Sequence, residues 1–198
     1  MKTIKNYLKM LNEAKSYKDG SMPNPYDYQS LELDEKVTRA DLKELDKFRK
    51  KMKKFEDPKL ADLTTKEWLY HEPPLMVGDP PGKRRKGFQV FVILDDNKRV
   101  GIVAFTSHSY EYEDIIWSSW VPGFNYAVRG TMKMIEQILN ENDRKYKISR
   151  VIFTHIWYKN IPSIRVAEKL KMRLVNPPAQ KGVSELYDLR QPFWWIKK

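Results

Sequence analysis

Apolar residues recur every three to four positions in five stretches of the chain, a spacing that predicts amphipathic helices. The predicted helices are residues 2–15, Thr38 to near Asp57, Thr64 to a stop at Pro73, Tyr126–Asn142 and Pro162–Leu170. Thr38 with Asp41, and Thr64 with Glu67, have the spacing of a capping box, in which side-chain oxygens satisfy free backbone amides. The pattern therefore also predicts where two of these helices begin.

The stretches between these helices carry strand signals. Polar and apolar residues alternate, or β-branched and aromatic residues cluster, at Ser30–Leu33, Phe88–Leu94, Val100–Thr106, Tyr110–Trp120, Val151–Tyr158 and around Glu185–Leu189. A turn at Asp95–Lys98 predicts an antiparallel hairpin from the second and third strands. The order of elements predicts an α+β fold: a mixed, mostly antiparallel central sheet flanked by helices on both faces.

Gly, Pro and polar residues interrupt the pattern at residues 18–25 and 77–87, which predicts loops. The first loop separates the helix at residues 2–15 from the elements that follow. We therefore expect a helical extension over residues 1–29 and one domain over residues 30–198. A chain of 198 residues is long enough for one such domain.

Composition narrows the class of protein. The chain has no cysteine, which excludes disulfide scaffolds, cysteine-ligated metal sites and thiol catalysis. It has no apolar run near the roughly 18 residues that a membrane helix needs. Its first residues also lack the apolar stretch of a secretory signal. We expect a cytoplasmic protein with no membrane partner.

The charge points to an anionic partner. Lysine and arginine number 37 against 26 aspartate and glutamate residues, a net charge of +11. This surplus favours nucleic acid, a membrane surface or a phosphate-bearing cofactor. The basic run Lys83–Lys86 and the lysine-rich helix around residues 47–54 are candidate nucleic-acid contacts. The sequence has no helix-turn-helix, zinc finger or paired aromatic sheet motif, so nucleic acid is an alternative and not the expected partner.

Several common catalytic motifs are missing from the sequence. It has no glycine-rich dinucleotide fingerprint, no phosphate-loop Gly-Lys-Ser/Thr and no Gly-x-Ser-x-Gly elbow. His71, His108 and His155 are scattered without the spacing of metal ligands, so no metal is expected.

Two strand-to-helix turns carry the remaining candidate chemistry. In Val121–Ala127, Gly123 allows close approach of the backbone to a ligand. Asn125 is a candidate N-cap there, and the helix behind it presents free amides and a partial positive charge. In Asn160–Leu170, Asn160 is placed to cap the short helix that follows a strand. Either turn alone also fits an ordinary capped helix.

Together, the strand, the glycine turn, the long helix, the next strand and the run Asn160–Leu170 resemble the GNAT superfamily of acyl-CoA N-acyltransferases. The run Asn-Ile-Pro-Ser-Ile-Arg-Val-Ala-Glu-Lys-Leu is most similar to the branch of ribosomal-protein N-terminal alanine acetyltransferases. Five positions depart from the family pattern. Lys171 replaces a glycine and Met172 the usual phenylalanine after the second motif, and Ala167 stands where many members have a general-acid tyrosine. In the pyrophosphate loop, Trp120 replaces a glutamine or arginine and Asn125 replaces a glycine or alanine.

The resemblance implies an activity, the transfer of an acetyl group from acetyl-CoA to a primary amine by direct attack of the amine. It also implies that the cofactor's pantetheine arm inserts between two splayed parallel strands, which end here near Trp117 and Tyr158. The implied acetyl-CoA contacts are Trp117, Ser119, Val121, Gly123, Phe124, Asn125, Tyr126, Ala127, Asn160 and Ser163. The candidates for general base are Glu111, Glu113, Asp114 and His155, and Tyr158 is a candidate general acid.

The acceptor stays open at this level. Protein N-termini, small amines, polyamines and aminoglycosides are all compatible, although a positively charged protein disfavours polycations. A catalytically degenerate binding or regulatory module of the same fold is an alternative, because two glycine positions are replaced. The aromatic tail Phe193–Trp195 either packs on the domain, lines the acceptor cleft or forms a homodimer contact.

Overall fold

The computed structural model describes residues 26–70, 89–107, 112–143, 151–176 and 184–189. Its strands are β1 (Glu32–Asp34), β2 (Gln89–Asp95), β3 (Lys98–Ser107), β4 (Tyr112–Ser119), β5 (Val151–Trp157), β6 (Arg173–Asn176) and β7 (Ser184–Leu189). Its helices are α2 (Arg39–Met52), α3 (Pro58–Ala61), α4 (Thr65–Tyr70), α5 (Tyr126–Asp143) and α6 (Ile161–Lys169), and a 3-10 turn, Lys53–Phe55, follows α2. The predicted helix at residues 2–15 and the loops at 18–25 and 77–87 lie outside these ranges. The boundary between residues 29 and 30 stays a prediction.

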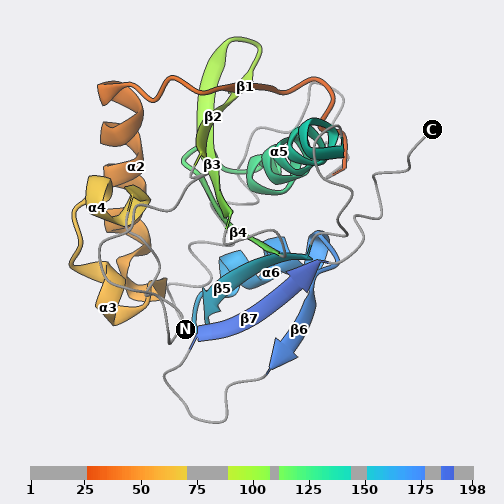
Figure 1. Ribbon diagram of the computed structural model, residues 1–198. Coiled ribbons are helices and arrows are strands. Elements are labelled where there is room, and N and C mark those ends of the chain that lie inside the picture. Colours follow the sequence, from red (N-terminus) through yellow and green to blue (C-terminus); the bar gives the residue numbers. More distant parts are fainter. Residues whose placement is uncertain (1–25, 71–88, 108–111, 144–150, 177–183, 190–198) are drawn as a thin grey trace.

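The strands form one mixed sheet in the order β1-β2-β3-β4-β5-β7-β6 (Figure 1). Within the described ranges β4 and β5 pair in parallel, and the other neighbours pair antiparallel. Helices α5 and α6 pack on one face, and α2 and α4 pack on the other. The predicted fold class, a mostly antiparallel α+β sheet flanked by helices, is confirmed.

The apolar pattern does not predict two short elements. Helix α3 is a single turn that begins at Pro58, and β6 is an edge strand whose register shifts between Leu174 and Asn176. Each has four residues, too few to display a helical or alternating period. Strand β1 also begins two residues later than predicted, because a turn comes first, with the Leu31 N–H donating to the Tyr28 carbonyl at 3.1 Å.

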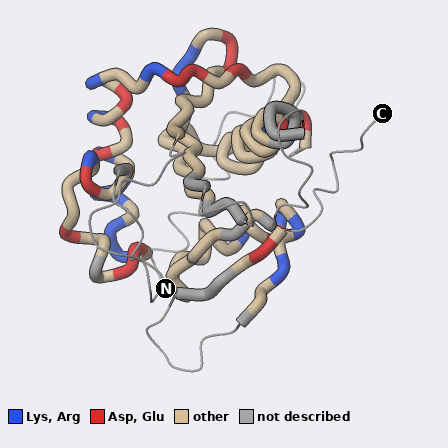
Figure 2. The backbone as a smooth tube through the Cα atoms, viewed as in Figure 1, with Lys and Arg blue, Asp and Glu red and all other residues tan. Residues whose placement is uncertain are grey.

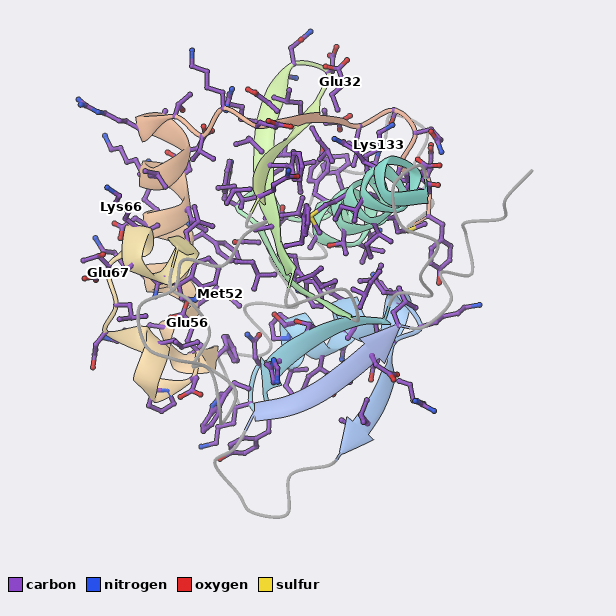
Figure 3. All side chains as sticks on the ribbon, in the orientation of Figure 1. Glu32, Met52, Glu56, Lys66, Glu67 and Lys133 are labelled. Carbon is purple, nitrogen blue, oxygen red and sulfur yellow. The ribbon has the colours of Figure 1, made fainter. Side chains whose placement is uncertain are left out.

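Both predicted capping boxes form. The Thr38 N–H donates to the Asp41 carboxylate at 2.7 Å, and the Asp41 N–H donates to the Thr38 hydroxyl at 3.3 Å. Thr64 and Glu67 make the same exchange at 2.8 and 3.2 Å. Glu67 and its neighbour Lys66 point outward from α4 into solvent (Figure 3). Each box satisfies amides that have no partner inside the helix, so local sequence defines both starts.

Arg49 joins α2 to the short helices from inside. Its guanidinium is 6% exposed and donates to the Glu56 carboxylate at 3.1 and 3.2 Å. It also donates to the carbonyls of Leu60 and Leu63, both at 3.0 Å, and lies 5.0 Å from the centre of the Trp68 ring. Figure 3 shows Glu56 among these helices. The ion pair therefore holds α2, α3 and α4 together as one layer.

Buried side chains form two clusters, one on each face of the sheet. The cluster beneath α5 and α6 extends from β2 to β7, and it includes Val128 and Ile135 on the apolar face of α5. The cluster beneath α2 and α4 takes its strand residues from β2, β3 and β4. Among the described residues it takes none from β5 or β7. The layer of α2 to α4 therefore stops at β4, and the corresponding face of β5, with exposed His155, lies beyond it.

Basic and acidic residues are interspersed along α2 to α4 (Figure 2). Three lysines there pair with carboxylates: Lys47 with Glu44 at 2.6 Å, Lys50 with Asp46 at 2.7 Å and Lys53 with Asp62 at 2.9 Å. The lysine-rich helix therefore does not present a surface of one sign.

The basic run Lys83–Lys86 and the tail Phe193–Trp195 lie outside the described residues. No helix in the described ranges combines the length and apolarity needed to cross a membrane.

Candidate functional site

Strands β4 and β5 meet at one end and part at the other. Residues Tyr112–Asp114 pair with Val151–Phe153, and the pairing between the two strands stops there. Further along, Ile115–Ser119 pair with β3 alone and Thr154–Trp157 pair with β7 alone. We call this arrangement the fork. Its facing backbone edges run without a ladder for four to five residues, about 15 Å of strand.

Both strands lead into helices at the open end of the fork. The loop Trp120–Asn125 connects β4 to α5, and Tyr158–Asn160 connect β5 to α6. Because parallel strands end at the same edge of a sheet, the N-termini of both helices lie at that edge. The amides of a first helical turn have no partner inside the helix and carry a partial positive charge. This edge is therefore suited to an anion.

The loop is fastened to β3 at several points. The amides of Trp120 and Val121 donate to the Val100 carbonyl at 3.2 and 3.4 Å. The indole N–H of Trp120 donates to the Arg99 carbonyl at 2.9 Å. The Ser119 hydroxyl is within donating distance of two carbonyls, those of Val100 at 3.1 Å and Val121 at 2.8 Å. The path of the loop is therefore fixed by hydrogen bonds to backbone carbonyls, donated by two loop amides and by the side chains of Trp120 and Ser119.

Two residues of the loop have left-handed backbone. The φ angle is 95° at Gly123 and 52° at Asn125. Such angles favour glycine, and asparagine is among the side chains that tolerate them best. The Asn125 carbonyl accepts from the Arg129 N–H at 2.9 Å, as that of an N-cap residue does. Its side chain does something else: Oδ1 accepts from Lys169 Nζ at 2.6 Å.

Helix α6 is closed at both ends by its own residues. The Asn160 side chain accepts from the Ser163 N–H at 3.2 Å, which is the predicted cap. At the other end the Lys171 N–H donates to the Glu168 carbonyl at 2.9 Å, and the next N–H donates to the Ala167 carbonyl at 3.0 Å. This is a Schellman motif, which normally has glycine at the position of Lys171, and the φ of Lys171 is 55°. Lys171 and Asn125 therefore both adopt the left-handed backbone that glycine favours.

Lys169 brings a positive charge to the loop. Its Nζ atom reaches Asn125 from the last turn of α6. Partial burial, and then the neighbouring Arg165, lower the pKa of Lys169 from its ordinary value. The contact also ties α6 to the start of α5, the two helices that follow the strands of the fork.

A second positive charge lies beneath the loop. Arg129, in the first turns of α5, is 2% exposed. Helical side chains lean toward the N-terminus, and Nη1 of Arg129 donates to the Phe124 carbonyl at 3.3 Å. Nε donates to the Asp27 carbonyl and Nη2 to the Ser30 hydroxyl at 3.0 Å, with the Tyr126 ring centre 5.5 Å from the guanidinium carbon. One side chain thus joins the loop to the segment before β1, which runs beside α5 (Figure 1).

The aromatic residues of the predicted cofactor set serve packing. The rings of Phe124 and Tyr126 stack with their centres 5.4 Å apart, and the Tyr126 hydroxyl donates to the Asp95 carboxylate at 2.6 Å. Trp117 and Val121 pack against the cluster beneath α5 and α6. At these four positions the side chains contribute to packing.

The candidate catalytic residues are spread along the fork. Glu113 and Asp114 belong to its closed end by their backbone pairing. His155, two residues beyond the last paired position of β5, is exposed on the face opposite α6. Tyr158 follows β5 at the open end, and Glu111 lies outside the described residues. In the described ranges no three His, Asp or Glu side chains gather closely enough to hold a metal ion.

The sequence pattern does not single out Arg129 or Lys169. For Arg129 a signal exists, because it lies in the apolar stripe of α5, next to Val128 and three residues before Met132. For Lys169 no local signal exists, because its partner Asn125 belongs to a distant part of the chain.

No family model and no curated protein matches the sequence. Solved structures match the fold. A domain from Methanocaldococcus jannaschii has a TM-score of 0.56 at 16% identity, over 81% of this chain and 98% of that chain. An acetyltransferase of the GNAT family from Bacillus anthracis has a TM-score of 0.52 at 17% identity, over 82% and 95%. AAC(6')-Ib in complex with ribostamycin and coenzyme A has a TM-score of 0.50 at 14% identity, over 81% and 92%. At these identities the likeness is one of fold: the chain has the GNAT-like acyl-CoA N-acyltransferase fold.

Proposed function

We propose that the protein is an acetyl-CoA-dependent N-acetyltransferase that acts on a primary amine. One observation carries the proposal: the fork opens toward the loop Trp120–Asn125 and the N-termini of two helices. An extended amide-bearing arm gains backbone partners when it lies beside an unpaired strand edge. A pyrophosphate gains converging amides at a helix N-terminus. AAC(6')-Ib, which shares the fold, binds coenzyme A in its solved complex.

The residues present fit the two parts of coenzyme A. The pantetheine arm would lie between the β4 edge that includes Trp117 and Ser119 and the edge of Thr154–Trp157. The pyrophosphate would lie on the amides of Gly123–Ala127, beside Lys169. Since the Oδ1 atom of Asn160 caps α6, its side-chain NH₂ is the group left to donate to the arm.

The chemistry needs a base but no protein nucleophile. The acceptor amine attacks the acetyl carbonyl, the new C–N bond forms, the C–S bond breaks and the thiolate leaves. The ammonium must first lose a proton, and His155 is our first candidate for the base, since it is exposed near the closed end of the fork. Glu113 and Asp114 are the alternatives at that end. Tyr158 lies at the opposite end, which argues against it as the acid for the departing thiolate.

The pH dependence of the rate tests the base. With His155→Gln we expect kcat/KM to fall by about 100-fold or more, together with loss of the acidic limb of the pH–rate profile. Glu113→Gln and Asp114→Asn are the matched variants and should retain that limb. If one of them loses it and His155→Gln does not, the assignment moves to that carboxylate.

The acceptor is proposed as a class, a small-molecule or peptide amine. The run Asn160–Leu170 supports the branch that acetylates N-terminal alanine of ribosomal proteins, whereas the comparisons single out no branch. The face of β5 beyond the α2-to-α4 layer is where the amine would approach His155. A screen should therefore set peptides with N-terminal alanine against polyamines and aminoglycosides.

Thermal unfolding with acetyl-CoA is the first experiment. Ligand at about 100 times its Kd should add about 2.7 kcal/mol, a rise on the order of 5–10 °C for a chain of this size. Tripolyphosphate in moderate salt is the control for general charge attraction. An equal shift with both ligands, or with neither, contradicts the proposal. Specific binding without transfer to any amine in the screen would instead indicate a binding or regulatory module.

A further inference from the structure

Arg129 differs from an ordinary buried arginine in what it contacts. Its partners are two carbonyl oxygens, those of Asp27 and Phe124, the Ser30 hydroxyl and the face of the Tyr126 ring. Among the described residues it forms no ion pair with a carboxylate, although it is 2% exposed. Dipoles and a ring satisfy its N–H groups but leave its unit charge in place.

A buried charge without a counter-ion is destabilising, because the interior solvates it poorly and screens it weakly. The field of such a charge therefore reaches further than that of a surface lysine. Here the guanidinium lies directly beneath the Phe124 carbonyl, one peptide from Asn125. The partial positive charge of the α5 N-terminus adds to it at the same place.

We infer that Arg129 supplies the fixed positive charge of the phosphate site, and that the polyanion bound at Gly123–Ala127 is its missing counter-ion. The inference rests on the proposed function and gives a residue of this chain a positioning and electrostatic role in it. It also explains how a loop with Asn125 in place of a smaller residue can still attract a pyrophosphate. The attraction comes from a buried charge behind the backbone and not from closer approach of the backbone.

The segment before β1 takes part in the same arrangement. Ser30 is exposed, but its hydroxyl accepts from Nη2 of Arg129 at 3.0 Å. A carboxylate at this position would pair with the guanidinium at Nη2, whereas the loop carbonyl of Phe124 is bonded to Nη1. It would then compete with the ligand's phosphates for the same charge. The amino-terminal segment is therefore the place from which the charge of the site can be altered without touching the loop.

The test compares Ser30→Asp with Ser30→Asn and Gln29→Glu. Asparagine matches the size of the aspartate without its charge, and Gln29→Glu adds the same charge at the next, exposed residue. Titration calorimetry would use coenzyme A, inorganic pyrophosphate and pantetheine, which lacks phosphate, at two salt concentrations. We expect Ser30→Asp to weaken coenzyme A and pyrophosphate binding about fivefold or more relative to Ser30→Asn. Gln29→Glu should change either affinity by less than about twofold, and pantetheine binding should be equal in all variants.

The outcomes separate the inference from the proposed function. Wild-type binding of coenzyme A with equal affinities in Ser30→Asp and Ser30→Asn overturns the inference and leaves the proposed function standing. An equal loss in Gln29→Glu and Ser30→Asp also overturns it, because the effect is then one of general surface charge. A wild-type protein that binds neither coenzyme A nor pyrophosphate overturns both. Pyrophosphate binding without coenzyme A binding supports the charge assignment and contradicts the proposed cosubstrate.

A second pair of variants tests whether the charge of Arg129 contributes to coenzyme A affinity. Arg129→Lys keeps the charge and should retain coenzyme A affinity within about threefold, whereas Arg129→Met should lose about tenfold or more. Equal losses in the two variants would mean that the guanidinium's hydrogen bonds, and not its charge, matter. If Arg129→Met does not fold, the Ser30 variants, which change an exposed residue, still decide the question.

Discussion

Two of the arginines that the structure describes are buried in similar surroundings, and one of them has a carboxylate partner. Arg49 and Arg129 are 6% and 2% exposed, each donates to two backbone carbonyls, and each guanidinium lies near an aromatic ring, at 5.0 and 5.5 Å. Arg49 also has the Glu56 carboxylate at 3.1 Å. Arg129 has the Ser30 hydroxyl in the corresponding role.

The comparison distinguishes an arginine that only stabilises the fold from an arginine whose positive charge can attract a ligand. The Arg49–Glu56 pair is neutral overall, so it joins α2 to the short helices α3 and α4 and leaves no net charge to attract an outside ion. Arg129 gains nearly the same number of hydrogen bonds but remains a net cation under a loop that faces solvent. Within the described ranges, the first has a carboxylate counter-ion and the second has none.

The largest expected effect is that of Arg49→Met. Removing the guanidinium leaves the Glu56 carboxylate, which is nearly buried, without a partner. We expect a loss of about 3–5 kcal/mol in the free energy of unfolding, measured by urea denaturation. Asp62→Asn, which removes an exposed partner of Lys53, is the control and should cost less than about 1 kcal/mol. Similar losses for the two variants would remove the basis of the comparison.

The same substitution at the other arginine should cost less. Arg129→Met leaves no described carboxylate without its partner, so the loss is that of three hydrogen bonds, offset by removal of a charge that no described residue compensates. We expect about 1–3 kcal/mol in the same urea experiment. A cost equal to that of Arg49→Met would show that Arg129 has a counter-ion after all.

Ser118 gives the same contrast, between a buried polar group with a partner and one without, for an uncharged side chain. Its hydroxyl is buried in β4 without a hydrogen-bond partner among the described residues. A buried hydroxyl without a partner destabilises the folded state, so Ser118→Ala should raise the free energy of unfolding by about 1 kcal/mol. Ser119→Ala is the matched variant, and it should be destabilising because that hydroxyl is bonded. A destabilised Ser118→Ala variant would indicate a partner that the contacts do not reveal.

A variant of Tyr28 tests how strongly the segment before β1 is held on α5 without changing Arg129. Its hydroxyl donates to Glu136 at 3.2 Å, and burial, followed by the charge of Glu136, raises the pKa of Tyr28 from 10.0 to about 12. The folded state therefore favours the protonated hydroxyl, a contribution present below pH 10 and lost as the pH rises from 10 to about 12.

Tyr28→Phe should cost about 0.5–1 kcal/mol at neutral pH. Its deficit relative to wild type should shrink as the pH rises from 10 to about 12. Parallel denaturation series of the two proteins measure this difference. A deficit independent of pH would mean that the phenol titrates alike in the folded and unfolded chains.

The long helices and strands of the fold could be predicted from the sequence, because each of them repeats its apolar pattern several times. Helix α5 has 18 residues, and the β2–β3 hairpin turns on Asp96 and Asn97, both with positive φ. The short β6 does not repeat its pattern, and it escaped prediction. Within the candidate site, local contacts were predictable and distant ones were not. The Asn160 cap joins residues three apart in the sequence, whereas the Asn125–Lys169 contact depends on tertiary structure.

Arg129 shows a second limit of the sequence pattern. Charged residues are rarely buried unless paired, so the position of Arg129 in the apolar stripe of α5 does not by itself identify what the guanidinium contacts. Its burial depends on Asp27 and Ser30, which lie about a hundred residues earlier in the chain. Periodicity describes which face of α5 is apolar, but not which distant carbonyls lie opposite it.

The fork also has a mechanical consequence. Across the junction of β4 and β5 the two parts of the sheet share three paired positions at one end. Along the open part of the fork the strands have no ladder between them and are joined through the side chains packed beneath α5 and α6. A molecule that bridges the two edges would add backbone hydrogen bonds where the ladder is missing. The empty protein should therefore be the more compliant form, and occupancy of the fork should slow amide exchange along Ile115–Ser119 and Thr154–Trp157 together.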